Sequence, residues 1–224
     1  MCGRYTLHKP WSDVHALYNL IGADQRLNMP ARYNIAPSQD VLTVRLEDGA
    51  QRAREAKWGL VPHWAKEGFK KPQINARSET VHEKPMFRDA FKRGRCLIPA
   101  DGFYEWTGPK GNKQPYYIHM GGQPFSFAGI WAHNDNLEIE SCAIITTSPA
   151  KQIAHIHNRM PVILKPEWYD LWLDPETPKD QAHTLLEENM GDVLKFHAVD
   201  KAVGKVSTQG PECIEPIGVD ADDT

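Results

Sequence analysis

Hydrophobic and polar positions alternate with a period of two through much of the chain, which is typical of β-strands. We predict strands over residues 4–8, 40–46, 53–58, 95–98, 102–106, 115–119, 125–131, 138–146 and 195–199. Polar or glycine-containing turns separate these runs at residues 47–49, 108–112, 121–122 and 133–136. The pattern therefore indicates a chain built mainly from hairpins.

Four segments show helical spacing instead. Ser12 is a candidate N-cap for a helix that carries Val14, Leu17 and Tyr18 on one face, and residues 86–92, 166–173 and 179–188 look helical. Hairpins with helices set between and around them favour an α+β domain with a mostly antiparallel, barrel-like β-sheet flanked by helices. Periodicity alone does not indicate whether the sheet closes into a barrel.

Composition narrows the class of protein. The 224 residues are 41% hydrophobic and 25% charged, so we expect one folded domain that needs neither disulfides nor a structural metal. Four cysteines lie far apart without a C-x-x-C pair, which argues against a zinc site and favours buried apolar roles for Cys96 and Cys142. We also expect no membrane span and no signal peptide, and therefore a cytoplasmic protein that is nucleoid-associated when bound to DNA.

The net charge of −3 hides an uneven distribution. Residues 66–95 hold nine basic and four acidic side chains, for a net charge of +5. Residues 166–192 hold one basic and eight acidic side chains, for a net charge of −7. The basic segment is suited to following nucleic-acid phosphates, and the alternative is a solvated helix face.

Cys2 directly follows the initiator methionine. Because Cys is small, Met1 is normally trimmed, and the mature chain then begins with an α-amine and a thiol on adjacent carbons. An α-amine has a pKa of about 7.7–8.0, so part of it is neutral and nucleophilic at physiological pH. The amine forms a Schiff base with an aldehyde, and the thiol then closes a five-membered thiazolidine ring. Cys2 is thus suited to aldehyde capture, unless it is an incidental second residue.

Glu105 lies in the segment D-G-F-Y-E-W. In a strand it shares a face with Phe103 and Thr107, while Tyr104 and Trp106 point the other way. A carboxyl group among aromatic side chains has a raised pKa and suits general acid–base chemistry. The alternative is an edge-strand carboxylate that faces water.

Three further segments carry candidate site residues. In I-A-H-I-H-N-R-M-P, a strand would bury one of His155 and His157 and expose the other, and neither has an evident third metal ligand. In I-N-A-R-S-E-T, an amide and a guanidinium can orient a polar ligand and bind phosphate, although Ser78 could equally begin a helix. In W-G-L-V-P-H-W, aromatic rings beside basic residues can stack unpaired bases, or they belong to the core.

Together these motifs resemble the SRAP (SOS-response-associated peptidase) family. C-G-R-Y, R-Y-N-I-A-P, W-G-L-V-P-x-W, I-N-A-R-S-E-T, D-G-F-Y-E-W and I-H-N-R-M-P-V-I-L occur in this order. Each motif is weak alone, but six in order are highly specific. The resemblance implies a single SRAP domain over residues 2–216, followed by an acidic flexible tail over residues 217–224.

The resemblance also implies a function. A member of this family binds single-stranded DNA in a positively charged groove and uses Cys2 to form a thiazolidine with the ring-opened sugar of an abasic site. Asn75 would orient the sugar and the amine, Glu105 would shuttle protons, and His157 would assist proton transfer at the opened sugar. Arg4 and Arg77 resemble phosphate contacts, and Asn34, Pro37 and Trp64 resemble groove residues. No cofactor and no metal are implied, and we expect a monomer.

The expected chemistry includes a Schiff-base intermediate, self-reversal of the crosslink and strand cleavage as a side activity. Peptidase activity could expose Cys2, although only Met1 precedes it. Two alternatives remain at this point: an amide hydrolase that uses Cys2 as an N-terminal nucleophile, and a non-covalent module that binds single-stranded DNA. A Cys2→Ser variant separates the three.

Overall fold

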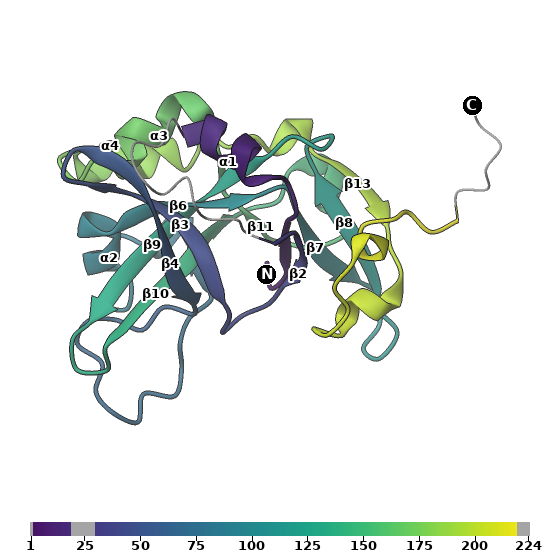
Figure 1. Cartoon of the computed structure of the whole chain (residues 1–224), viewed down its shortest axis with the longest axis horizontal. Coiled ribbons are helices and arrows are strands. Elements are labelled where there is room, and N and C mark those ends of the chain that lie inside the picture. The colour runs from purple at the N-terminus through teal and green to yellow at the C-terminus, as the bar shows by residue number, and fades with distance from the viewer. Residues whose placement is uncertain (1, 19–29, 219–224) are drawn as a thin grey trace.

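A computed structural model of the protein describes residues 2–18 and 30–218. Two β-sheets form its frame, and the larger sheet lies on the left of Figure 1 while strands of the smaller sheet lie on the right. Five strands of the larger sheet pair in a closed ring, in the order β10-β4-β3-β6-β9 and back to β10. They span β3 Asp40–Glu47, β4 Ala50–Trp58, β6 Arg95–Ala100, β9 Phe125–Asn134 and β10 Ile139–Thr147.

The barrel strands are antiparallel except where β10 runs parallel to β4. Three short strands extend the ring: β5 (Asn75–Arg77) pairs parallel with β10, β11 (Met160–Pro161) pairs antiparallel with β10, and β12 (Ile163–Leu164) pairs with β9. The end of β10 is therefore flanked by both β5 and β11.

The smaller sheet has the order β13-β8-β7-β1-β2 and is antiparallel throughout. Its strands are β1 Tyr5–Leu7, β2 Arg32–Ile35, β7 Gly102–Thr107, β8 Gln114–His119 and β13 Lys195–Ala198. Side chains alternate across β7, so Phe103 joins the main core while Tyr104 joins a second cluster under the C-terminal segment. One face of this sheet thus closes against the barrel and the other holds residues 199–217.

Helices are short and lie at the outside of the barrel in Figure 1. They are α1 Trp11–Tyr18, α2 Arg88–Arg93, α3 Tyr169–Leu173 and α4 Lys179–Leu185. Helix α2 contacts β6 and β9, and α3 contacts β6. Six described segments are 3₁₀ turns, including η2 Ser78–Thr80, η3 Lys151–Ile153 and η5 Gly191–Val193. Within residues 2–18 and 30–218, no helix is both long and apolar enough to cross a membrane.

The predicted fold class is confirmed: the protein is an α+β domain on a mostly antiparallel, barrel-like sheet with flanking helices. All nine predicted strands are present within one to three residues at each end. One local prediction is wrong: helix α1 begins at Trp11, so Ser12 lies inside it and is not its N-cap. The predicted tail lies partly outside the described residues.

Candidate active site

Register in the smaller sheet places the N-terminal segment beside Glu105. Strand β1 pairs with β7 through Tyr5↔Phe103, and the main-chain N–H of Tyr104 donates to the oxygen of Arg4 at 3.0 Å. Continuing this antiparallel register puts Gly3 level with Glu105. Cys2 therefore enters the site from a strand that is fixed on both sides, by β7 and by β2.

The Cys2 side chain is fully buried, and its thiol donates a long, weak hydrogen bond to the oxygen of Arg4 (3.9 Å). Burial raises the pKa of this thiol well above its usual range, and the nearby Glu105 carboxylate raises it further. At neutral pH the thiol is consequently protonated. The predictions that Cys96 and Cys142 are buried are confirmed, and burial raises the pKa of Cys96 to about 12.

Asn75 ties the N-terminal segment to the barrel. It lies at the start of β5, where Ala76 is buried and Asn75 and Arg77 face the other way. Its side-chain amide donates to the main-chain oxygen of Cys2 at 2.8 Å. Its side-chain oxygen is buried and has no hydrogen-bond partner among the described residues. A buried acceptor without a partner costs free energy, so this oxygen is available for a donor that a substrate supplies.

Glu105 is only 3% exposed. Burial raises the pKa of its carboxyl to about 7, so both protonation states are populated at physiological pH. The expectation of a raised pKa is thus confirmed, and the alternative of a water-facing carboxylate is wrong. A group poised in this way can both donate and accept a proton.

His157 faces Glu105 from the turn that follows η3. Its Nδ1 lies 3.9 Å from Oε1 of Glu105, and the main-chain N–H of Arg159 donates to the same nitrogen at 3.0 Å. Burial lowers the pKa of His157, and the positive charge of Lys113 lowers it further. The imidazole is therefore mainly neutral at pH 7, beside a carboxyl group that titrates near that pH.

An ion pair that was not predicted from the sequence holds this turn in place. The guanidinium of Arg159 donates to both carboxylate oxygens of Glu79, at 2.5 and 2.9 Å, and to the oxygen of Thr146 at 2.5 Å. Glu79 lies in η2, directly after β5. The pair thus links the His157 turn to the segment that carries Asn75. Both residues stand within motifs of the sequence, but their pairing is not readable from it.

The residues that were predicted to contact DNA fall into two groups in the structure. Arg77, Trp64 and half-buried Pro37 reach the surface, and Trp64 is 47% exposed. Arg4 instead donates to Oδ1 of Asn34 and to the oxygens of Val203 and Gly204. Their roles in DNA binding stay predictions.

Asn34 is fully buried beneath the C-terminal segment. Its amide donates to the oxygens of Val203, Lys205 and Thr208 at 2.9 to 3.0 Å. These bonds, with those of Arg4, fasten residues 203–208 to strand β2 and to the residue directly before β1. In the described structure, Arg4 and Asn34 therefore organise the protein next to Cys2.

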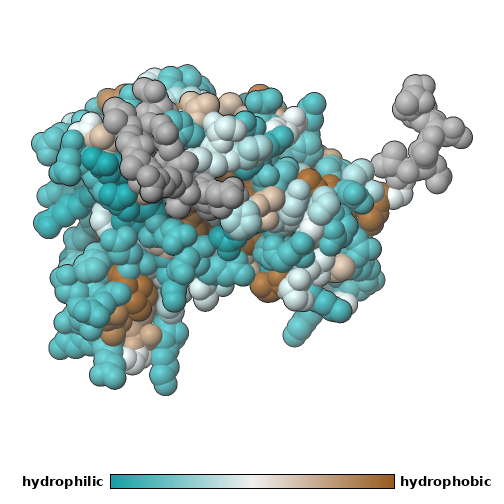
Figure 2. Space-filling view, viewed as in Figure 1, coloured by the Kyte–Doolittle hydropathy of each residue, from teal (hydrophilic) through white to brown (hydrophobic). Residues whose placement is uncertain are grey.

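Hydrophilic residues dominate the face shown in Figure 2, which is hollowed between the barrel and the part of the smaller sheet that carries β8 and β13.

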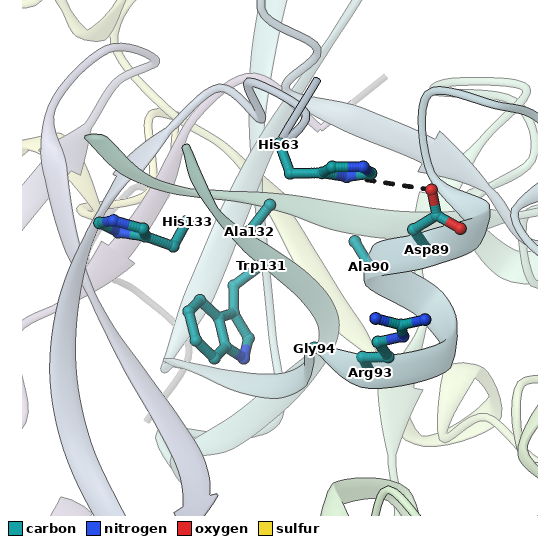
Figure 3. Close-up of a pocket in the computed structure, with 8 residues that line it drawn as sticks. All are labelled: His63, Asp89, Ala90, Arg93, Gly94, Trp131, Ala132 and His133. Carbon is teal, nitrogen blue, oxygen red and sulfur yellow. Dashed lines mark ion pairs between the residues drawn. The ribbon is translucent and has the colours of Figure 1, made fainter. Parts of the chain in front are cut away.

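A separate cavity of about 320 Å³ lies against α2 and β9 (Figure 3). Its walls include His63, Asp89, Arg93 and Trp131, and none of the four predicted catalytic residues lines it. In the part of the chain that the structure describes, no group of three or more His, Cys, Asp or Glu side chains could hold a metal ion.

Comparison with known proteins finds similarity over nearly the whole chain. The family described as SOS response associated peptidase (SRAP) matches residues 1–206. The abasic site processing protein YoqW of Bacillus subtilis is 39% identical over 228 residues, which cover 96% of this chain and 99% of YoqW. The abasic site processing protein YedK of Escherichia coli is 32% identical over 228 residues, covering 97% and 100%. The abasic site processing protein HMCES of Gallus gallus is 33% identical, covering 76% of this chain and 59% of HMCES.

Solved structures agree on the fold. A protein from Bacteroides thetaiotaomicron superimposes with a TM-score of 0.82 at 25% identity, covering 96% of this chain and 99% of that chain. A phage-related protein from Bordetella bronchiseptica gives a TM-score of 0.73 at 34% identity, covering 89% and 95%.

Proposed function

Because the chain belongs to the SOS response associated peptidase (SRAP) family, we propose that it processes abasic sites by capturing their ring-opened sugar in single-stranded DNA through Cys2. The names of the relatives support abasic sites as the substrate class. The observation that carries the chemistry is the convergence of Cys2, Asn75, Glu105 and His157. These four residues are far apart in the sequence, and each of them has a contact or a charge interaction with another member of the group: Asn75 with Cys2, Cys2 with Glu105, and Glu105 with His157.

Removal of Met1 turns the main-chain nitrogen of Cys2 into an α-amine. In the first step this amine attacks the C1 aldehyde of the opened sugar, and the resulting carbinolamine loses one water to form an imine. The thiol sulfur then adds to the imine carbon, and its proton passes to nitrogen, which closes the thiazolidine. One water is released overall, and no oxidant or reductant is consumed.

The order of these steps follows from acidity. Burial keeps the thiol of Cys2 protonated, whereas an α-amine with a pKa of about 7.7–8.0 is partly neutral at physiological pH. The amine is therefore the first nucleophile and the thiol the second. An amide hydrolase would need the thiolate as its first nucleophile, so the raised thiol pKa argues against that alternative.

Glu105 and His157 supply the proton transfers. A carboxyl group with a pKa of about 7 can protonate the departing hydroxyl of the carbinolamine and later accept a proton during ring closure or reversal. The neutral imidazole, 3.9 Å from that carboxyl group, can exchange protons with it and with the O4′ oxygen of the opening sugar. The open acceptor of Asn75 suits the α-amine or a sugar hydroxyl.

The experiment is a denaturing gel of Met-trimmed protein mixed with an oligonucleotide that holds one abasic site. A heat-stable, slower band is expected, and it should be absent with an intact oligonucleotide, with Cys2→Ala and with protein that retains Met1. Cys2→Ser should give a band only after borohydride reduction, because it forms the imine but not the thiazolidine. No band from the trimmed protein, with trimming verified by mass, overturns the proposal and leaves amide substrates to be tested.

A further inference from the structure

Aromatic side chains continue the face of the smaller sheet on which Glu105 lies. Glu105 is directly opposite Tyr116 in the β7–β8 pair, and Tyr116 is directly opposite Ala198 in the β8–β13 pair. Phe196 is two residues from Ala198 along β13. Since side chains alternate along strands, Glu105, Tyr116 and Phe196 all project from the same face. The face that holds the carboxyl group thus ends in two aromatic rings at the edge of the sheet.

Phe196 is unusually accessible for a large apolar side chain in a strand, at 36% exposure. Its ring meets Tyr116 at 6.1 Å between centroids and 64° between planes, and it meets His155 at 5.3 Å and 60°. Both neighbours approach at steep angles, so neither lies flat on the Phe196 ring. We call His155, Tyr116 and Phe196 the aromatic platform. It is open to a flat partner.

One turn of the chain joins the aromatic platform to the active site. His155 contacts Phe196, and His157, two residues later, lies 3.9 Å from Glu105. The main-chain oxygen of His155 accepts a hydrogen bond from Oγ1 of Thr107, which is on the same face as Glu105. The platform is therefore continuous with the site and is held to the same strand.

One exposed cation lies next to the strand that holds the platform. Lys113 directly precedes Gln114, which pairs with Thr107 of β7, and its charge acts on both Glu105 and His157. A cation at this place suits a phosphate group on a sugar that occupies the site. Lys110, three positions earlier in the same loop, is also exposed.

We propose that the aromatic platform stacks the base of the nucleotide next to the abasic site, and that Lys113 binds the phosphate between the two sugars. This inference rests on the proposed function and adds to it a subsite for one flanking nucleotide. Aromatic rings beside a cation form the usual surface for unpaired bases, because every base offers a flat face to stack on. The platform would hold the flanking nucleotide so that the opened sugar meets Cys2.

Phe196→Ala tests the stacking contact. At subsaturating protein we expect the rate of crosslinking to an abasic oligonucleotide to fall about tenfold, which corresponds to about 1.4 kcal/mol, within the range measured for base stacking. Phe196→Trp should keep the wild-type rate. Ile217→Ala is the matched control, because Ile217 is 45% exposed but lies beside Glu212 and Glu215. It should not change the rate.

Changing the oligonucleotide tests whether the contact that Phe196→Ala removes is one with the neighbouring base. Two further oligonucleotides carry a tetrahydrofuran spacer, which has neither a base nor an aldehyde, in place of the nucleotide on the 5′ side or on the 3′ side of the abasic site. The penalty of Phe196→Ala should vanish with one of them and persist with the other, which assigns the side. Lys113→Ala should weaken binding with a shallower dependence on salt, by about 0.7 in the log–log slope, while Lys110→Ala should not change the slope.

The platform is overturned if Phe196→Ala matches wild type on all three oligonucleotides, or if its penalty stays the same when either neighbouring base is missing. Failure of the proposed function gives a different result, because wild type itself would then form no crosslink. In that case, equilibrium binding of the same oligonucleotides to wild type and Phe196→Ala still decides the platform. Equal affinities overturn it.

Discussion

The side-chain amide of Asn75 donates a hydrogen bond of 2.8 Å to the main-chain oxygen of Cys2. This bond joins strand β5 of the barrel to the N-terminal segment of the smaller sheet, across seventy-three positions of sequence. It holds Cys2 by its main-chain oxygen, so the nitrogen and the thiol that we propose as nucleophiles take no part in this bond. The buried oxygen of the same amide remains open toward the site.

Asn75→Leu removes both functions of this amide. We expect crosslinking to slow by about ten- to a hundredfold, because the aminothiol loses its orientation. The free energy of unfolding should fall by only about 1 kcal/mol, the usual net value of one hydrogen bond. Single-turnover crosslinking rates and urea unfolding measure the two effects. Equal rates for wild type and variant would remove Asn75 from the site.

Glu105→Gln should change the pH dependence of the rate. The acid form of Glu105 is lost as pH rises through about 7, and the neutral amine of Cys2 appears through about 7.7–8.0. Wild type should therefore show a bell-shaped profile with its maximum between these values. The variant should be slower by about a hundredfold or more and should lack the alkaline limb. An unchanged profile would exclude Glu105 as the proton donor.

Although Glu105→Gln should slow crosslinking, it should raise the free energy of unfolding at alkaline pH. The pKa of Glu105 is about 7 in the folded protein against about 4.3 in the unfolded chain, so the folded state binds the proton more tightly. Wild-type stability should then fall as pH rises from about 4.5 to 7, and stay level above that. Glu105→Gln should be more stable than wild type by about 1 to 3 kcal/mol at pH 8 and equal to it near pH 4. Denaturant unfolding at both pH values checks this; a variant less stable at pH 8 contradicts it.

Arg4→Ala and Arg77→Ala should have different effects on stability and on DNA binding. Arg4 bonds to Asn34, Val203 and Gly204, so its loss should lower the free energy of unfolding by about 1 to 3 kcal/mol. Arg77 is exposed, so its loss should leave stability within about 0.5 kcal/mol and weaken DNA binding with a shallower salt dependence. Thermal unfolding and binding titrations at several salt concentrations distinguish the two. Identical behaviour would contradict the structural role of Arg4.

Arg159→Ala should uncouple the His157 turn from β5. Because Glu79 is half exposed, the ion pair itself contributes little to stability, and we expect a loss of about 1 kcal/mol. The rate of crosslinking should fall by more than this loss of stability alone would explain, since His157 is no longer fixed beside Glu105. Glu79→Gln should produce the same kinetic change, and the double variant should add nothing further. Additive effects on the rate would show that the two residues act separately.

The face on which Glu105 lies was predictable from local pattern. Alternation along residues 103–107 follows from strand geometry, and the structure confirms it through the separate clusters of Phe103 and Tyr104. The burial of Glu105 was not predictable with the same certainty, because the covering turn comes some fifty residues later. Its raised pKa is therefore a tertiary property.

Short elements of the site could not be predicted from the sequence for a related reason. Strand β5 has three residues, only one of them apolar, and it exists because it pairs in parallel with β10. The bidentate contact between Arg159 and Glu79 spans eighty positions. Both residues lie within motifs of the sequence, yet only the fold shows that an ion pair joins the two motifs.

The central claim is covalent capture at Cys2, and mass spectrometry of the intact adduct tests it most directly. Met-trimmed protein and an abasic oligonucleotide should give a heat-stable product whose mass is the sum of both minus one water. Digestion with trypsin should leave the DNA remnant on the peptide from Cys2 to Arg4. A remnant on a lysine, such as Lys113, or the absence of any adduct from correctly trimmed protein, would contradict the account.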